Sequence, residues 1–136
     1  TGAGGMFGGV LRSAGIGDAL KFFLDGIGIP VILAAYIIAV ALRLAQGSAT
    51  VALTTTASLM ASGVMAGDFS ELQVIAITLA TAAGSVFASH VNDSGFWLVG
   101  RLLGMDTATT LRTWTIQQAI ESLMVFALSA MLFIVA

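Results

Sequence analysis

Histidine, asparagine and aspartate gather in one short segment, Ser89-His90-Val91-Asn92-Asp93-Ser94-Gly95, which we call the polar break. Apolar stretches flank it on both sides, which predicts one helix interrupted in its middle. Ionisable groups inside a membrane are costly and mark substrate, ion or proton pathways. His90 or Asp93 could carry a proton, and the free N–H groups of a broken helix could bind an anion. The alternative is a solvated loop between two separate helices.

A second cluster, Gly47-Ser48-Ala49-Thr50, interrupts another apolar stretch, and we call it the hairpin tip. Small residues let the backbone approach a ligand, and hydroxyl groups can bind a carboxylate or a polyol. Arg43 precedes the tip by one helical turn and could hold a substrate carboxylate through a bidentate contact. Alternatively, Arg43 neutralises an acidic residue outside this chain or extends to the membrane interface. We favour this structural role for Arg43 and substrate contact for the tip, although helix packing also explains many small-residue patches.

The serine, histidine and aspartate residues of the two clusters are also the residue types of a hydrolase catalytic triad. Ser48 or Ser94 with His90 and Asp93 superficially supplies a nucleophile, a base and an orienting acid. However, Ser94, Asp93 and His90 are so close in sequence that one local segment would have to form the triad. The sequence also lacks the Gly-x-Ser-x-Gly elbow of such hydrolases. We therefore predict that the protein is not an enzyme.

The composition indicates a membrane protein. Hydrophobic residues make up 58% of the 136 residues, charged residues only 9%, and the mean hydropathy is +1.04. A soluble domain carries about 25% charged residues, so a globin-like soluble fold would lack its charged outer face, and much of the surface must contact lipid. The net charge of −2 leaves no basic patch for nucleic acid. With no cysteine and one histidine, we predict no metal site and no cofactor.

The hairpin tip is predicted to lie in a helical hairpin that covers residues 29–66. Pro30 is well placed to start its first helix. Only about a dozen apolar residues precede Arg43, whereas a transmembrane helix needs about 20. We therefore predict a re-entrant hairpin whose tip reaches the membrane interior, where irregular backbone survives only if protein or water covers it.

Residues 72–103 are predicted to form the broken helix, and residues 114–136 the last transmembrane helix. Ser70 is a plausible cap at the start of the broken helix. Trp114 is placed as an interfacial anchor for the last helix.

The opening segment, residues 1–28, is predicted to be a solvated or interfacial linker. It is rich in glycine and carries four charged residues, which are Arg12, Asp18, Lys21 and Asp25. The chain begins with Thr1 instead of methionine, and no charged n-region precedes an apolar stretch. We therefore expect a piece of a longer polypeptide and no signal peptide.

Both clusters resemble segments of one transporter family. Arg43-Leu44-Ala45-Gln46-Gly47-Ser48-Ala49-Thr50-Val51-Ala52 resembles the Arg-x-x-x-Gly-Ser-Ala-Thr-Val-Ala segment of the gluconate:proton symporter family, and the polar break with Phe96-Trp97 is similar to that family's most distinctive stretch. Thr110-Leu111-Arg112-Thr113-Trp114-Thr115 and Gly2-Ala3-Gly4-Gly5 fit in the same order. The resemblance implies the C-terminal part of an all-α membrane transporter, which would be one half of an inverted-repeat transporter. It also implies a homodimer and a missing N-terminal part of the same chain.

The resemblance implies proton-coupled symport of gluconate, another sugar acid, D-serine or a related small hydroxylated carboxylate. The protein would be a multi-pass protein of the bacterial cytoplasmic (inner) membrane, with the small organic acid, protons and membrane lipid as its partners. The predicted substrate-binding residues are Gly47, Ser48, Thr50, Ser89, Asn92 and Ser94, with His90 and Asp93 for proton coupling and Arg43 as a carboxylate partner. The alternative is a non-transporting membrane subunit or scaffold whose polar helix breaks serve helix packing.

Overall fold

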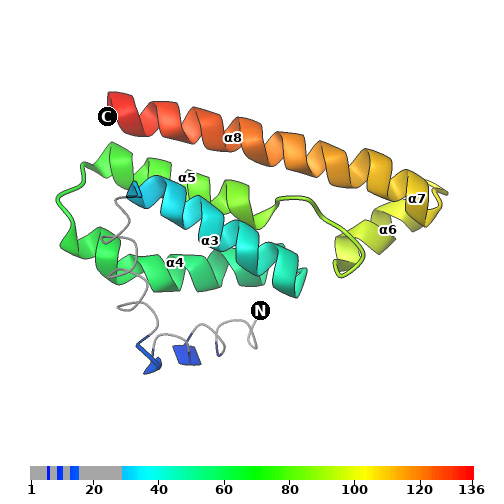
Figure 1. Cartoon of the computed structure of the whole chain (residues 1–136), viewed down its shortest axis with the longest axis horizontal. Helices are drawn as coiled ribbons and strands as arrows, with labels where there is room; N and C mark the ends of the chain where they lie inside the picture. The colour runs from blue at the N-terminus through cyan, green and yellow to red at the C-terminus, as the bar shows by residue number, and fades with distance from the viewer. Residues whose placement is uncertain (1–5, 7–8, 11–12, 16–28) are drawn as a thin grey trace.

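The computed structural model describes residues 6, 9–10, 13–15 and 29–136. Within these residues the chain is helical and contains no strand, which confirms the all-α prediction for this part of the chain. Figure 1 shows long helices lying side by side, with the C-terminal helix along one edge. The charged residues predicted for the linker (Arg12, Asp18, Lys21 and Asp25) lie outside the described residues.

Two helices meet at the hairpin tip. Helix α3 (Val31–Gln46) begins after Pro30 and ends at Gly47, whose φ of 76° is left-handed. Glycine adopts this conformation without the steric cost of a Cβ atom, and it ends many helices for that reason. Helix α4 (Ala49–Ala66) begins directly afterwards, because the Ser48 Oγ accepts a backbone N–H of its first turn at 3.4 Å.

The lengths of the helices bear on the re-entrant prediction. Among the described helices, α4 and the continuous run Thr107–Val135 are long and apolar enough to cross a membrane, whereas α3 and α5 (Glu71–Ser85) are shorter. At 1.5 Å per residue, α3 extends for about 24 Å, less than the roughly 30 Å of bilayer hydrocarbon. The hairpin therefore combines one short and one longer helix, and its re-entrant character stays a prediction.

The predicted broken helix consists of two helices with a connection between them. Helix α5 begins at a capping box in which the Ser70 Oγ accepts the Gln73 N–H at 3.2 Å, so the predicted cap is confirmed. Residues 86–93, which we call the α5–α6 connection, leave the helical path, and α6 (Ser94–Leu102) follows. The connection contains Ala88, whose φ of 44° is unusual for a residue with a Cβ atom.

The last helix begins earlier than predicted. Helix α7 (Thr107–Thr110), a π-helical turn (Leu111–Thr115) and α8 (Ile116–Val135) follow one another without a gap. Asp106 caps this run, so helical structure starts at Thr107 and already includes Trp114. Single π-helical turns inside α-helices are rare and often occur at functional sites.

Small residues bring α3 and α5 close together in the core. A Cβ atom on Gly84 of α5 would lie 2.6 Å from the backbone oxygen of Tyr36 in α3. The Tyr36 ring stacks on Phe126 of α8 at a centroid distance of 4.2 Å, and its hydroxyl lies 3.0 Å from the Ser122 Oγ. This packing places the end of α3 beside the α5–α6 connection (Figure 1).

Candidate functional site

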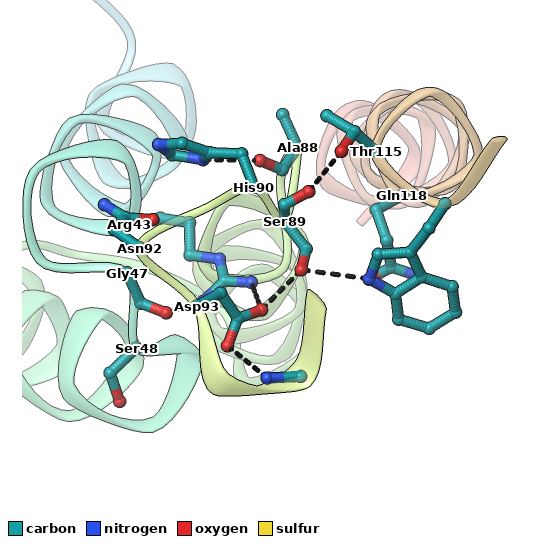
Figure 2. Close-up of polar contacts among 12 residues, drawn as sticks. Arg43, Gly47, Ser48, Ala88, Ser89, His90, Asn92, Asp93, Thr115 and Gln118 are labelled. Atoms are coloured by element: carbon teal, nitrogen blue, oxygen red, sulfur yellow. Dashed lines mark hydrogen bonds and ion pairs between the residues drawn. The ribbon is translucent and has the colours of Figure 1, made fainter. Parts of the chain in front are cut away.

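An ion pair between a buried arginine and a partly buried aspartate joins the two polar clusters. The Arg43 Nη2 on the last turn of α3 lies 2.5 Å from the Asp93 Oδ2 at the start of α6, and the Arg43 Nη1 donates to the Gly47 carbonyl. Figure 2 shows the two charged side chains pointing toward one another. Arg43 is only 3% exposed, although its side chain is charged. The prediction that its acidic partner lies outside this chain is therefore wrong, because Asp93 supplies the charge.

The Asp93 carboxylate accepts hydrogen bonds on both oxygens. Besides Arg43, the Ser89 Oγ donates to Oδ2, and the Gly95 backbone N–H donates to Oδ1 at 2.9 Å. Asp93 is thus the N-cap of α6, where an anion is favoured by the free N–H groups and the helix dipole. An ionised carboxylate only accepts hydrogen bonds, so these contacts fit the charged form.

Backbone contacts also hold the hairpin tip against the polar break. The Asn92 amide nitrogen donates to the Leu44 carbonyl at 2.9 Å. A Cβ atom on Gly47 would lie 2.7 Å from the carbonyl carbon of Asn92 and even closer to its oxygen. No side chain fits at that point, which explains both the glycine and the close approach of two segments that are far apart in sequence.

The start of the last helix contacts the polar break through Ser89. The Trp114 Nε1 donates to the Ser89 Oγ at 3.0 Å, and the Thr115 Oγ1 donates to the Ser89 carbonyl at 2.5 Å. Trp114 and Thr115 were not predicted to belong to the site. The similarity of the Thr110–Thr115 segment to the same family could have indicated that they do. The structure adds a contact between Trp114 and the polar break, and the position of Trp114 at the membrane interface stays a prediction.

The other predicted site residues lie around this network without joining it. Ser48 caps α4, and Figure 2 shows its hydroxyl directed away from Asp93. Thr50 and Ser94 are exposed at the starts of α4 and α6. The His90 Nδ1 lies 2.9 Å from the Ala88 carbonyl. The structure therefore brings Arg43, Gly47, Ser89, Asn92 and Asp93 into contact and leaves the other side chains at the border of the cluster.

Comparison with known proteins decides the family. The model of the GntP family permeases matches residues 1–135, almost the entire chain. The chain belongs to the GntP permease family. This confirms the resemblance that was drawn from the hairpin tip and the polar break, and it makes the chain part of a membrane permease.

Several curated relatives of this permease chain are named as transporters. It is 49% identical over 116 residues to the inner membrane permease YgbN of Escherichia coli (strain K12), which covers 85% of the chain and 25% of that protein. It is 43% identical over 119 residues to the low-affinity gluconate transporter of the same strain, covering 88% of the chain and 27% of that protein. It is 38% identical over 133 residues to the Gnt-II system L-idonate transporter of that strain, covering 95% and 30%. The chain thus spans 25% to 30% of the length of these three relatives, and no solved structure matches it.

Proposed function

We propose that the complete GntP permease carries gluconate or a related small hydroxylated carboxylate, together with a proton, across the cytoplasmic membrane. The names of the relatives support a sugar acid, because they include gluconate and L-idonate transporters. The observation that carries the proposal is the ion pair between the buried Arg43 and the partly buried Asp93, at the contact of the hairpin tip with the polar break.

The ion pair can couple an anion to a proton through charge balance. A buried guanidinium requires an anion beside it, and ionised Asp93 fills this role. A substrate carboxylate that entered next to ionised Asp93 would leave one excess negative charge in a site with little water. If Asp93 first accepts a proton, the guanidinium is released and binds the substrate carboxylate through its planar fork. The net charge of the site then stays the same, so one proton accompanies each carboxylate.

Helix lengths support a location of this site within the membrane. Helix α6 has 9 residues and extends for about 14 Å, roughly half the thickness of the bilayer hydrocarbon. The run Thr107–Val135 has 29 residues and extends for about 44 Å, so it is long enough to span the bilayer. Its contact with the polar break through Thr115 lies about 12 Å from its start. The run is about 14 Å longer than the hydrocarbon is thick, so the polar break lies inside the membrane if most of this surplus length is at the C-terminal end of the run, and we propose this placement.

The border residues are suited to bind the hydroxyl groups of the substrate. Ser48, Thr50 and Ser94 offer hydroxyls near the starts of α4 and α6, where helix N–H groups favour an anionic ligand. The Asn92 amide nitrogen is engaged with a carbonyl of α3, so Asn92 would contact the substrate through its amide oxygen. His90 is the second candidate for the proton, but Asp93 is favoured because it contacts Arg43 directly.

Uptake of labelled gluconate into vesicles that contain the full-length permease tests the proposal, with and without an imposed proton gradient. We expect gradient-driven accumulation that Arg43→Met abolishes, since the substrate then lacks its cation. Asp93→Asn should lose the dependence on the gradient but retain exchange of labelled for unlabelled gluconate, because the guanidinium is permanently free. Arg101→Gln and Asp68→Asn are matched controls on exposed residues and should behave like the native protein.

Gradient-driven accumulation at the native rate in Asp93→Asn would refute the charge-balance mechanism. Uptake of D-serine or another hydroxy acid in place of gluconate would preserve the mechanism and change the substrate. Uptake by His90→Ala should still depend on the proton gradient. If that dependence is lost, the proton carrier is His90 instead of Asp93.

A second candidate is a non-transporting membrane subunit, which the cross-element contacts of the polar break favour. Asn92 and Ser89 join the break to α3 and to the last helix, as a packing role would require. Solvent access separates the two functions. A cysteine placed at Ala49 should react with a polar thiol reagent, and gluconate should protect it, if the tip is a transport site. A sealed, unreactive cysteine would favour the packing role.

A further inference from the structure

The hydroxyl of Ser89 lies between the Asp93 carboxylate and the Trp114 indole. A serine hydroxyl has one hydrogen to donate and two lone pairs that accept, whereas an indole nitrogen can only donate. The Trp114 Nε1 donates to the Ser89 Oγ at 3.0 Å, so it occupies a lone pair of that oxygen. Ser89 is only 1% exposed, so water does not compete for these positions. The hydrogen of Ser89 is therefore directed to the Asp93 Oδ2 (Figure 2).

We propose that Trp114 is a positioning residue that fixes the direction of the hydrogen bond from Ser89 to Asp93. The inference rests on the proposed function in one respect, namely that the proton carried during transport resides on Asp93. A hydrogen bond donated to a carboxylate favours its charged form. The indole N–H repels the hydroxyl hydrogen from one of its orientations, and without it the Ser89 hydroxyl turns more readily to accept a hydrogen bond from protonated Asp93. The last helix would thus set the pH at which Asp93 takes up its proton and releases Arg43.

Other charged groups around Asp93 stay unchanged when Trp114 is replaced. Arg43 faces the carboxylate from α3, and the first turn of α4 carries no acidic or basic residue. In the α5–α6 connection, His90 contacts a backbone carbonyl and has no hydrogen bond to Asp93. Arg101 of α6 and Arg112 of the π-helical turn are exposed. On α8, Glu121 is exposed and accepts a hydrogen bond from Gln118 at 3.0 Å. A change in the proton uptake of Asp93 would therefore originate from Ser89.

Labelling with dicyclohexylcarbodiimide, which attacks protonated carboxyl groups in apolar surroundings, tests this inference without requiring transport. The full-length permease in membranes is labelled over a series of pH values, and the modification of Asp93 is measured by mass spectrometry. Ser89→Ala removes the donor, so we expect its half-labelling pH to rise by about one unit. Trp114→Phe leaves the hydroxyl free to turn, and we expect a smaller rise of about half a unit. The pH profile of gluconate uptake should move in the same direction.

The second tryptophan of the polar region provides a matched control. The Trp97 Nε1 donates at 2.8 Å to the carbonyl of Val91, within the polar break but not on Ser89. Trp97→Phe therefore loses the same kind of hydrogen bond and should leave the half-labelling pH of Asp93 unchanged. If Trp114→Phe fails to fold, benzothienylalanine at position 114 keeps the ring size and replaces only the N–H by sulfur. Adding Trp114→Phe to Ser89→Ala should cause no further shift, because both act through one hydroxyl.

An unchanged half-labelling pH with benzothienylalanine at position 114 would overturn the inference. Additive shifts in the double variant would also overturn it, since they would mean that Trp114 acts independently of Ser89. If labelling shifts but the pH profile of uptake does not, the positioning role stands and the proposed role of Asp93 in transport fails. The two ideas are therefore tested separately.

Discussion

Replacing Gly47 by alanine should force the hairpin tip away from the polar break. Two separate costs arise at this position. The φ of 76° is left-handed, which costs a residue with a Cβ atom about 1–2 kcal/mol. The new Cβ atom would also lie 2.7 Å from the carbonyl carbon of Asn92, where 3.4–4 Å is an ordinary contact. Overpacking of this kind costs about 1–3 kcal/mol, and backbone atoms cannot rotate away from it. We therefore expect Gly47→Ala to destabilise the permease by roughly 3 kcal/mol.

Three other glycines isolate the contributions to this cost. Gly104 has a φ of 64°, but a Cβ atom there would meet no atom within 4 Å, so Gly104→Ala should show only the backbone cost of about 1–2 kcal/mol. Gly84→Ala places a Cβ atom 2.6 Å from the Tyr36 oxygen without a left-handed φ, so it should show only the packing cost. Gly63 lies inside α4 with free space around it, and Gly63→Ala should be neutral or stabilising by up to about 1 kcal/mol.

Thermal unfolding of the full-length permease in detergent measures these costs, and gluconate uptake at matched protein levels measures the effect on the site. We expect Gly63→Ala to be the most stable of the set, Gly104→Ala to be intermediate and Gly47→Ala to be less stable than Gly104→Ala. Uptake should be lost in Gly47→Ala and retained in Gly104→Ala, because only the former displaces the polar break. If Gly47→Ala unfolds and transports like Gly104→Ala, then the tip and the break are not in contact and our account of the site is wrong.

Three further substitutions probe the neighbourhood of the site. Ala88→Gly should stabilise the permease by about 1 kcal/mol, since glycine adopts the positive φ of this position freely; a lower unfolding temperature would contradict this. Tyr36→Phe should cost about 1 kcal/mol in the same unfolding assay through the lost contact with Ser122, and equal stability would mean that the hydroxyl contributes nothing. Arg43→Met should destabilise by about 1–3 kcal/mol, because the partly exposed Asp93 loses its partner but keeps the donors of Ser89 and Gly95, and the addition of Asp93→Asn should restore part of this stability; additive losses would contradict a direct pair.

The positions of the two polar clusters could be predicted because each is a local signal. Gly47 and Ser48 are a helix stop followed by a helix cap, and both properties belong to the residues themselves. Asp93 is likewise a cap residue directly before an apolar stretch. The helix boundaries were less accurate: α5 already ends at Ser85, ahead of the polar residues. A helix end depends on packing and caps as well as on where polar side chains begin.

The contacts between the clusters could not be predicted from these local patterns. Arg43 and Asp93 are 50 residues apart, and nothing near either residue indicates which partner the fold provides. The contact of Trp114 with Ser89 was missed for a similar reason. A tryptophan at the start of an apolar helix is typical of a membrane interface, and only the fold places its N–H on Ser89. The family resemblance included all three segments but did not say that they touch.

If the proposed charge balance holds, coupled transport of proton and substrate costs less free energy than transport of either one alone. The hairpin and the polar break are joined by the ion pair, so parting them while Asp93 is ionised would leave the buried guanidinium of Arg43 without its partner, at a cost of about 3–5 kcal/mol. A proton without a substrate neutralises the Asp93 carboxylate and leaves the guanidinium of Arg43 without an anion beside it. A substrate without a proton places two carboxylates beside one cation. Only the empty, ion-paired site and the site with both proton and substrate are balanced, so we expect the permease to change its access to the two sides of the membrane in these two states alone.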